Sequence, residues 1–442
     1  MTDTIKKQKK ATDFLSSAHL TKLLIVIVMM YSFSIQSYYA IIPETVRIVL
    51  LLGMPLALSL LLIFTGMKRN LRVRISATVV SAVCMIIVML IWNNHTIRAE
   101  GLAGMFGQLM PMVFFLAIYK RNDWYNICIN IMIAMGMFYT MWTFICLISP
   151  SVYYSGIAPL MKSLYPNIGY DVDSKAGFTA HYSTNGMYLA NGIIACISRI
   201  TELKKNRAMK NLRWYYAMLV LNASAFLICG KRGILLCLVF ACYFTYFIYN
   251  FHRQRGKMFK AAVFSLIIIM AVYIASLIVP SLANAYNRMQ LMISKGDVST
   301  GRFDLWAAGW DAFRTSPIVG HGWRWFYYYD TTVFMNYDIH NCYIQFLAEL
   351  GIVGSIPFYT FFFVNIYRTI KLAKINIIAY GGSSHKEHNY GYMTFALLYQ
   401  AFFLAFIFES TAFYNPEALV PYVVSCAMTE NNYMKKREIN KI

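Results

Sequence analysis

Apolar runs of bilayer length recur along the whole chain and constrain its fold more than any other feature. A helix that crosses the hydrocarbon core needs about 20 predominantly apolar residues. The sequence has twelve such candidates, centred near residues 31, 56, 84, 110, 136, 190, 221, 241, 272, 353, 400 and 423. Apolar residues make up 59% of the 442 residues and charged residues 13%, against about 45–50% and 25% in soluble proteins. The sequence therefore predicts an all-α polytopic membrane protein with about 12 transmembrane helices, and it excludes a soluble globular fold.

Two of these candidate spans are weaker than the others. The sixth carries several polar side chains, namely Ser183, Thr184, Asn185 and Asn191. The twelfth is short, because only residues 418–428 precede the polar tail of residues 429–442. We expect either span to be partial or tilted.

The positive charges indicate how the chain is oriented. The formal net charge is +21, from 40 Lys and Arg against 19 Asp and Glu. With a cytoplasmic N-terminus, 29 of the 40 cations fall in cytoplasmic segments, which are residues 1–22, 67–74, 120–123, 199–213, 250–260, 366–390 and 429–442. This is the asymmetry of the positive-inside rule. It predicts a multi-pass protein of the cytoplasmic membrane with both termini cytoplasmic and the lipid bilayer as its surroundings, and no nucleic acid is needed to explain the charge.

The cysteines and acidic residues give no sign of a metal centre. Nearly all of the nine cysteines lie in apolar stretches without a C-x-x-C pair, which is typical of small core residues. Asp171 and Asp173 form a D-x-D sequence, but a three-residue match is common by chance. We interpret them as solvated loop carboxylates and predict neither a metal nor a cofactor.

Two long segments between spans face the outside in this topology. They are residues 149–181 and residues 284–340, within a single transmembrane domain of residues 1–442. Loops longer than about 12–15 residues are usually functional or disordered. These two are rich in aromatic residues, and the five cations of residues 284–340 are matched by five aspartates. We therefore predict an ordered, helical extracytoplasmic cap that holds an active or binding site.

The larger loop contains a predicted helix that begins near Ser299 and ends before Pro317. Aromatic residues at three- and four-residue intervals, Phe303, Trp306, Trp310 and Phe313, predict an apolar face that packs on the membrane domain. Arg302 lies in the first turn, where a cation opposes the helix dipole unless an anion is bound there. The alternative is a surface arginine paired with Asp304 or Asp311.

His340 and Asn341 lie where this loop enters the tenth span. Gly351 and Gly354 lie three turns deeper, where glycine allows close helix contact. Histidine at a membrane boundary can act as a general base near neutral pH, because its ordinary pKa is about 6.5. The alternative role for His340 is that of an interfacial anchor.

A tight external turn between the seventh and eighth spans carries Lys231 and Arg232. Charge at such depth is costly and marks a functional site by default, although snorkelling of a helix-end cation to the headgroups is the alternative. A guanidinium has the planar fork that suits phosphate oxygens. This turn is therefore a candidate anion site.

Two further features supply polar groups near the outer face. Residues 175–186, which include His181 and Asn185, are dense in hydroxyl, amide and imidazole groups that could bind sugar hydroxyls or satisfy one another. Glu409, near the outer end of the eleventh span, is an intramembrane acid. We favour an ion pair with Arg232 over a role as a second base.

Together these residues resemble the O-antigen polymerase and O-antigen ligase superfamily of bacterial envelope glycosyltransferases. Its hallmark is His, then Asn, Ser or Gln, nine residues, Gly, two residues and Gly. The matching residues are His340, Asn341, Gly351 and Gly354; Arg232 and Gly233; Gly301, Arg302, Trp306, Pro317, Gly320 and Gly322; and Gly177 and Asn185. Ser355 departs from the commonest pattern, which has Thr there. The resemblance covers residues 177–354, and its motifs are specific in combination.

The resemblance implies a metal-independent transferase of the GT-C type that needs no cofactor. Its donor and acceptor would be undecaprenyl-diphosphate-linked oligosaccharides, with a chain-length regulator and a flippase as further partners. It implies His340 as the catalytic base and arginines as diphosphate clamps. The residues agree with this chemistry, since an anionic leaving group at the outer headgroups would lie near Arg232 and Arg302. The expected substrate-binding residues are Arg232, Arg302, Asn341, His181, Asn185 and Lys231.

Other functions compete with this interpretation. A polysaccharide flippase or other transporter also suits twelve spans, but transporters generally bind near the bilayer midplane and often show repeats. A non-catalytic assembly protein would leave His340, Arg302 and Arg232 without a shared purpose. Within the enzyme class, polymerase and ligase differ only in the acceptor. We favour a polymerase for a capsular or exopolysaccharide, with an O-antigen polymerase or ligase as the alternative.

Overall fold

The computed structural model describes eleven stretches of the chain, and every structural statement below refers to them. They are residues 18–39, 53–67, 76–93, 99–121, 124–159, 175–179, 181–205, 211–250, 301–329, 337–379 and 390–439. Their helices are α2 (Ala18–Tyr39), α4 (Met54–Met67), α5 (Ala77–Ile91), α6 (Ala99–Ile118), α7 (Tyr125–Ile148), η2 (Val152–Ile157), α9 (Tyr182–Lys205), α10 (Leu212–Cys229), α11 (Arg232–Asn250), α14 (Arg302–Thr315), α15 (Trp325–Tyr329), α16 (Cys342–Ala379), α17 (Tyr390–Glu409), η4 (Ala412–Tyr414) and α18 (Pro416–Ile439). Within these stretches there is no strand, so the predicted all-α class is confirmed for them.

The long helices coincide with the apolar runs of the sequence. Each predicted span centre lies inside a helix except the one near residue 272, which lies outside the described residues. In the described part of the chain, α7, α10, α11, α16 and α17 are each long and apolar enough to cross a membrane. Shorter apolar stretches lie in α2, α4, α5 and α6. The fold is that of a polytopic membrane protein, because only a helix can satisfy every backbone group of such a segment within lipid.

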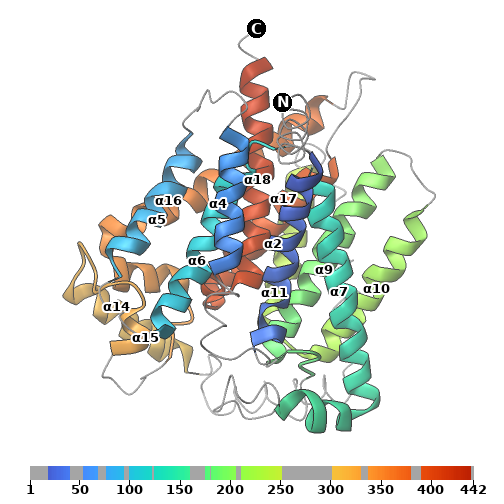
Figure 1. Cartoon of the computed structure of the whole chain (residues 1–442), viewed down its shortest axis with the longest axis horizontal. Coiled ribbons are helices and arrows are strands. Elements are labelled where there is room, and N and C mark those ends of the chain that lie inside the picture. The colour runs from blue at the N-terminus through green and yellow to red at the C-terminus, as the bar shows by residue number, and fades with distance from the viewer. Residues whose placement is uncertain are drawn as a thin grey trace, which may run out of the picture.

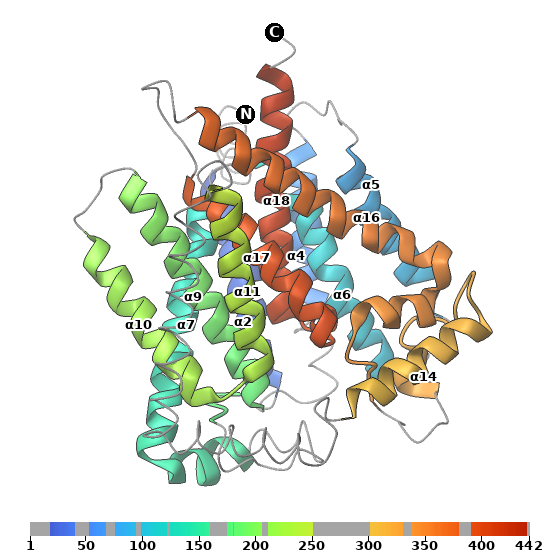
Figure 2. The same cartoon turned by 180° about the vertical axis from the view of Figure 1, so that it is seen from behind.

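The helices form a bundle with α9 and α17 at its centre. α9 packs against α7, α10 and α17, and α17 also packs against α11, α16 and α18. α14 and α15 lie at the lower end of the bundle in Figure 1, opposite the end of α18. The turn between α10 and α11 lies at the same lower end in Figure 2. We call this the cap end, because it carries the described parts of both long loops.

α9 explains how the weak sixth span forms a helix. Its polar side chains contact other helices: the Asn191 amide donates to the Glu417 carbonyl (3.0 Å) and accepts from the Tyr399 hydroxyl (2.9 Å). Gly192 allows the backbone of α9 to touch α7, because a Cβ there would lie 2.9 Å from the Gly136 Cα. The polarity of this span therefore reflects contact with protein on all sides.

The helix at the twelfth candidate span is longer than its apolar run. α18 continues to Ile439 and so includes most of the predicted polar tail. Glu430 is buried and pairs with the Arg368 guanidinium (2.5 Å), which also lies over the Tyr433 ring. Thr429 is bonded to Thr369 (2.7 Å). Hydropathy missed this extension because the polar groups are satisfied by other helices, a property of the fold that a single segment does not encode.

Candidate functional site at the cap end

The motif glycine Gly351 marks a break in α16. Its φ and ψ are 63° and −170°, which lie outside the helical region. A segment that follows α14 supplies hydrogen bonds at the break. Its Pro317 and Ile318 carbonyls accept from the backbone N–H groups of Ile352 (2.9 Å) and Val353 (3.1 Å), and its Gly322 N–H donates to the Glu349 carbonyl (2.7 Å). The cap is thereby bonded into the broken helix, the arrangement by which irregular backbone is tolerated at membrane depth.

This docking explains the glycine pattern of the motifs. A Cβ on Gly351 would overlap the Ile318 carbonyl oxygen, and a Cβ on Gly320 would overlap the Glu349 carbonyl; both glycines have positive φ. Gly354 meets the expected role in helix contact, since its Cβ position lies 3.5 Å from Trp92 and from Val88 of α5. Gly351 does not, because its close neighbour is the cap segment.

Replacing Gly351 with alanine is expected to detach the cap. The positive φ alone costs an alanine about 1–3 kcal/mol, and the overlap with Ile318 adds to it. The expected result is a lower melting temperature in detergent and less folded protein. Gly156→Ala is the control, because nothing lies within 4 Å of its Cβ position. Equal melting temperatures for the two variants would contradict the assigned role of Gly351.

His340 lies immediately before α16 in a strained conformation. Its φ is 55°, a left-handed value that is unusual for a residue other than glycine. Asn341, only 1% exposed, caps the helix: its Oδ1 accepts from the N–H groups of Tyr343 (3.0 Å) and Ile344 (3.2 Å). In the structure, the Asn341 side chain therefore fixes the start of α16 beside His340. Its substrate-binding role remains a prediction.

Three helix ends meet around Glu409, the last residue of α17. The Arg302 guanidinium, in the first turn of α14, donates to its Oε1 in an ion pair whose side chains are 27% and 21% exposed. Gly233, in the first turn of α11, lies against the same carboxyl group, because a Cβ there would overlap it. Glu409 was expected to pair with Arg232; the pair that the structure describes is with Arg302. In the described part of the chain, Arg302 is therefore paired with Glu409 and not with Asp304 or Asp311.

Lys231 and Arg232 bring further positive charge to this point. Burial lowers the pKa of Lys231; the Glu409 carboxylate raises it, and the neighbouring Arg302 and Arg232 lower it. Because Gly233 packs against the Glu409 carboxyl group, the two residues before it in the chain, Lys231 and Arg232, lie at the start of α11 beside the pair of Arg302 and Glu409. We call Lys231, Arg232, Arg302 and Glu409 the cationic cluster.

His340 lies within the field of the cationic cluster. Burial lowers its pKa below the ordinary value of 6.5; Asp338 raises it, Arg302 and Lys231 lower it, and Glu409 raises it. The net lowering leaves the imidazole neutral at pH 7, the form that can accept a proton. The structure thus brings together Lys231, Arg302, His340 and Glu409 from segments that are far apart in sequence.

His181 and Asn185 lie differently from one another. The His181 Nδ1 accepts from the Ser183 N–H (3.1 Å) at the start of α9, and its ring packs on Tyr182, over whose ring the Lys231 ammonium also lies (5.8 Å). Asn185 is fully buried and donates to the Thr143 hydroxyl (2.9 Å) and the Lys175 carbonyl (3.0 Å). His181 is therefore near the cationic cluster, whereas Asn185 anchors residues 175–177.

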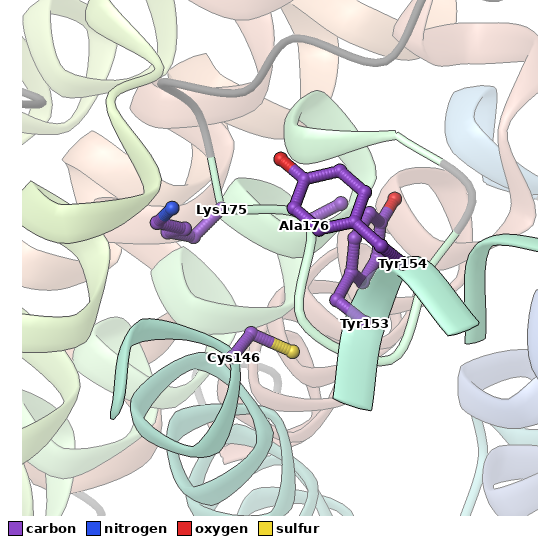
Figure 3. A pocket seen from close by; sticks show the side chains of 5 residues that line it. All are labelled: Cys146, Tyr153, Tyr154, Lys175 and Ala176. Carbon is purple, nitrogen blue, oxygen red and sulfur yellow. The ribbon is translucent and has the colours of Figure 1, made fainter. Parts of the chain in front are cut away.

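A small pocket lies beside those anchored residues. Figure 3 shows its lining, which consists of Cys146, Tyr153, Tyr154, Lys175 and Ala176. None of these side chains belongs to the cationic cluster. Asp171 and Asp173 lie outside the described residues.

The buried face of α14 is offset from the predicted one. Leu305 and Gly309 are buried, and Ile339 lies against Gly309. Phe303 and Trp310 are 63% and 41% exposed, so the expected aromatic packing face is wrong at these two positions. Trp306 does pack on Phe408 of α17 (5.4 Å between ring centres). The buried face of α14 differs from the predicted one because α14 packs against the chain at the start of α16, where Gly309 leaves room for Ile339 and a large ring would not fit.

A second charged group lies near His340 and was not predicted from the sequence. Arg324 pairs with Asp338 (2.6 Å), and the fully buried Glu349 accepts from the Arg324 N–H (2.9 Å). An acid inside an otherwise apolar span is a signal of function. The rule that singled out Glu409 would have found Glu349 as well.

Comparison with known proteins supports the resemblance drawn from the motifs. Residues 217–359 match the family described as O-Antigen ligase. The matched region contains Lys231, Arg232, Arg302 and His340. No curated protein matches the chain. The resemblance to the O-antigen ligase and polymerase superfamily is thereby confirmed for this third of the chain, and with the apolar helices it indicates a multi-pass membrane protein.

Proposed function

We propose, from the O-antigen ligase match of residues 217–359, that the protein is a membrane glycosyltransferase that polymerises undecaprenyl-diphosphate-linked oligosaccharides. The reaction would take place on the outer face of the cytoplasmic membrane, in the assembly of a capsule, exopolysaccharide or O-antigen. We further propose a GT-C-like fold of twelve spans with both termini cytoplasmic, and a cap built from residues 149–181 and 284–340. The enzyme would need neither metal nor cofactor. A flippase would deliver its donor, and a chain-length regulator would act beside it.

The cationic cluster is the observation that carries this proposal. Lys231 and Arg302 lie beside the Glu409 carboxylate, and Arg232 begins α11 next to them. Such a collection of cations at a helix end suits an anionic ligand. A diphosphate offers several oxygens to guanidinium groups. It would reach the cluster at the end of the helix bundle, with its prenyl chain remaining in the bilayer.

His340 is the proposed general base. Its neutral imidazole takes the proton of an acceptor hydroxyl as that oxygen forms a bond to the anomeric carbon. The bond between the anomeric carbon and the diphosphate oxygen breaks, and its electron pair leaves with the diphosphate. Arg232 and Arg302 stabilise the charge that develops there. Attack from the face opposite the leaving group gives inversion at the anomeric carbon.

The ion pair between Arg302 and Glu409 fits this sequence of events. In the free protein Glu409 satisfies the guanidinium, so that Arg302 is held in place before the donor binds. One carboxyl oxygen of Glu409, Oε2, is buried and has no hydrogen-bond partner among the described residues. A donor sugar hydroxyl could supply that bond. Glu409 would then contribute to both charge balance and sugar binding, while His181 and Lys231 line the same side of the site.

A ligase is the second candidate, because the matched family is described as O-Antigen ligase. It would use the same donor and the same base, and it would transfer the glycan to a lipid, a polymer or a protein. A flippase is less well supported, since the cationic cluster lies at one end of the bundle, away from the middle where transporters bind substrates.

Reconstitution with a defined donor tests the proposal. Purified protein in lipid nanodiscs is given undecaprenyl-diphosphate-linked repeat units with EDTA present, and the products are separated by gel electrophoresis. A polymerase forms a ladder of lipid-linked oligomers and releases undecaprenyl diphosphate. A ligase forms product only when a second acceptor, such as a lipid core oligosaccharide, is added. Absence of any transfer with EDTA, and its restoration by a divalent cation, would contradict the metal-independent mechanism.

A further inference from the structure

The carboxylate of Asp338, two residues before His340, is held by Arg324. The Arg324 guanidinium donates to Asp338 Oδ1 at 2.6 Å. The same guanidinium lies over two aromatic rings, 4.4 Å from the ring centre of Tyr414 and 4.6 Å from that of Tyr327. Stacking and ion pairing together fix an arginine more firmly than either does alone. The chain just before His340 is thus attached to a rigid group.

Glu349, about two turns into α16, is bonded to the same Arg324. Its carboxylate is fully buried and accepts from the Arg324 backbone N–H (2.9 Å), the Tyr414 hydroxyl (3.2 Å) and the Gln345 amide (2.9 Å). The Gln345 amide also donates to Asp338 Oδ1 (3.1 Å). These contacts join Arg324, Asp338, Gln345, Glu349 and Tyr414 into one network. Among the described residues, Gln345 Oε1 is the atom of this network that is buried without a hydrogen-bond partner. The two carboxylates are both bonded, which is the condition for keeping charge in a protein interior.

Backbone strain occurs at both edges of this network. Within the described residues, Arg324 (φ 61°) and His340 (φ 55°) are the two residues other than glycine with positive φ. Such conformations persist only where the surroundings over-determine them, and they gather at functional sites. One strained residue belongs to the network itself, and the other is the proposed base that it flanks.

We propose that Arg324, Asp338 and Glu349 are positioning residues that hold His340 in its strained conformation for proton transfer. This inference rests on the proposed function. None of the three contacts the reacting atoms in this scheme; they act through the chain of residues 338–340. A base displaced by about 1 Å from its productive position loses about 10²-fold in rate, so a rigid support has a direct kinetic effect.

The charge of Asp338 adds a second, measurable consequence. It raises the pKa of His340, as Glu409 does, against the lowering by burial, Arg302 and Lys231. Loss of the Asp338 charge therefore lowers that pKa further. The acid limb of the rate profile, where protonation of His340 stops turnover, then moves to lower pH.

Asp338→Asn tests the proposal, because asparagine keeps the size and one acceptor oxygen but loses the charge. The expected result is a fall in kcat of about 10²-fold, an unchanged KM for the undecaprenyl-diphosphate donor, and an acid limb shifted to lower pH. Asp311→Asn is the matched control, since Asp311 forms an exposed pair with Arg314 on α14. The control should leave kcat, KM and the acid limb unchanged.

A double variant separates positioning from general stability. In a His340→Gln background the network has no base to position, so Asp338→Asn should cause no further loss of residual transfer. If the Asp338→Asn protein does not accumulate, Arg324→Lys provides the test. Lysine keeps the positive charge but lacks the planar fork of arginine, so kcat should fall while the acid limb of the pH profile stays in place.

Two outcomes would overturn the inference. One is an unchanged kcat in the network variants while His340→Gln is inactive, which leaves the proposed function standing. The other is a further loss on adding Asp338→Asn to His340→Gln, which assigns the network to folding alone. Full activity of His340→Gln would instead remove the base itself, and with it the premise shared with the proposed function.

Discussion

Replacing His340 with glutamine should lower turnover by about 10²–10⁴-fold, the usual contribution of a general base. Glutamine can still accept a hydrogen bond, but it cannot take up a proton. Donor binding should change little, because the phosphate contacts are assigned to the cationic cluster. The measurement is the initial rate of transfer in nanodiscs, together with donor affinity by filter binding or fluorescence.

His321→Gln is the matched control for this variant. His321 also lies in the cap, stacked on Trp325, with its Nε2 bonded to the Ala312 carbonyl (2.9 Å). It has no assigned part in catalysis, so this variant should retain turnover. A His340 variant that keeps normal turnover, or one that loses donor affinity in proportion to turnover, would remove the proton-acceptor role.

The helices were predictable because each depends on its own sequence. A long apolar segment in lipid has to bond its backbone internally, so α7, α10, α11, α16 and α17 follow from composition and length alone. The motif marked Gly351 as a special position, but the break in α16 at this residue was not predicted. The sequence indicated close helix contact, whereas the structure has the segment after Pro317 bonded into the break.

The partners of buried polar groups were not predictable in the same way. Hydropathy places Glu430 in a polar tail, yet Arg368 on another helix makes the burial of Glu430 possible. Asn185 and Asn341 were predicted to bind substrate, and in the structure both bond to backbone or side-chain groups of the protein itself. Pairing across helices depends on the packed arrangement, which a single segment does not encode.

In the candidate site too, individual residues were predictable from the sequence, whereas their contacts with one another were not. Arg302, His340 and Lys231 were each singled out because a cation or an imidazole at a membrane boundary needs an explanation. Their convergence on Glu409 required the topology of α11, α14 and α17. The network of Arg324 and Glu349 was not predicted, because the pairing of Arg324 with Asp338 and the bond from the Arg324 N–H to Glu349 depend on how the cap segment docks on α16.

Arg302→Gln should lower kcat/KM by about 10²–10³-fold, the range found when one preorganised donor is removed from an oxyanion site. The variant loses both the charge and the fork that would meet the leaving diphosphate. Arg302→Lys should recover part of this loss, since the charge remains and bidentate bonding does not. Arg314→Gln, on the same helix in an exposed pair with Asp311, is the control and should behave as the unmodified protein.

The ion pair complicates this variant, because removal of Arg302 leaves the partly buried Glu409 carboxylate without its partner. Breaking one side of such a pair destabilises a protein through the charge left behind. The double variant Arg302→Gln with Glu409→Gln removes both charges, so the melting temperature should recover towards that of the unmodified protein. Transfer should stay low, because the cation for the diphosphate is still missing. Recovery of transfer along with stability would mean that Arg302 serves only to neutralise Glu409, and the diphosphate would then have to be held by Arg232 and Lys231 alone.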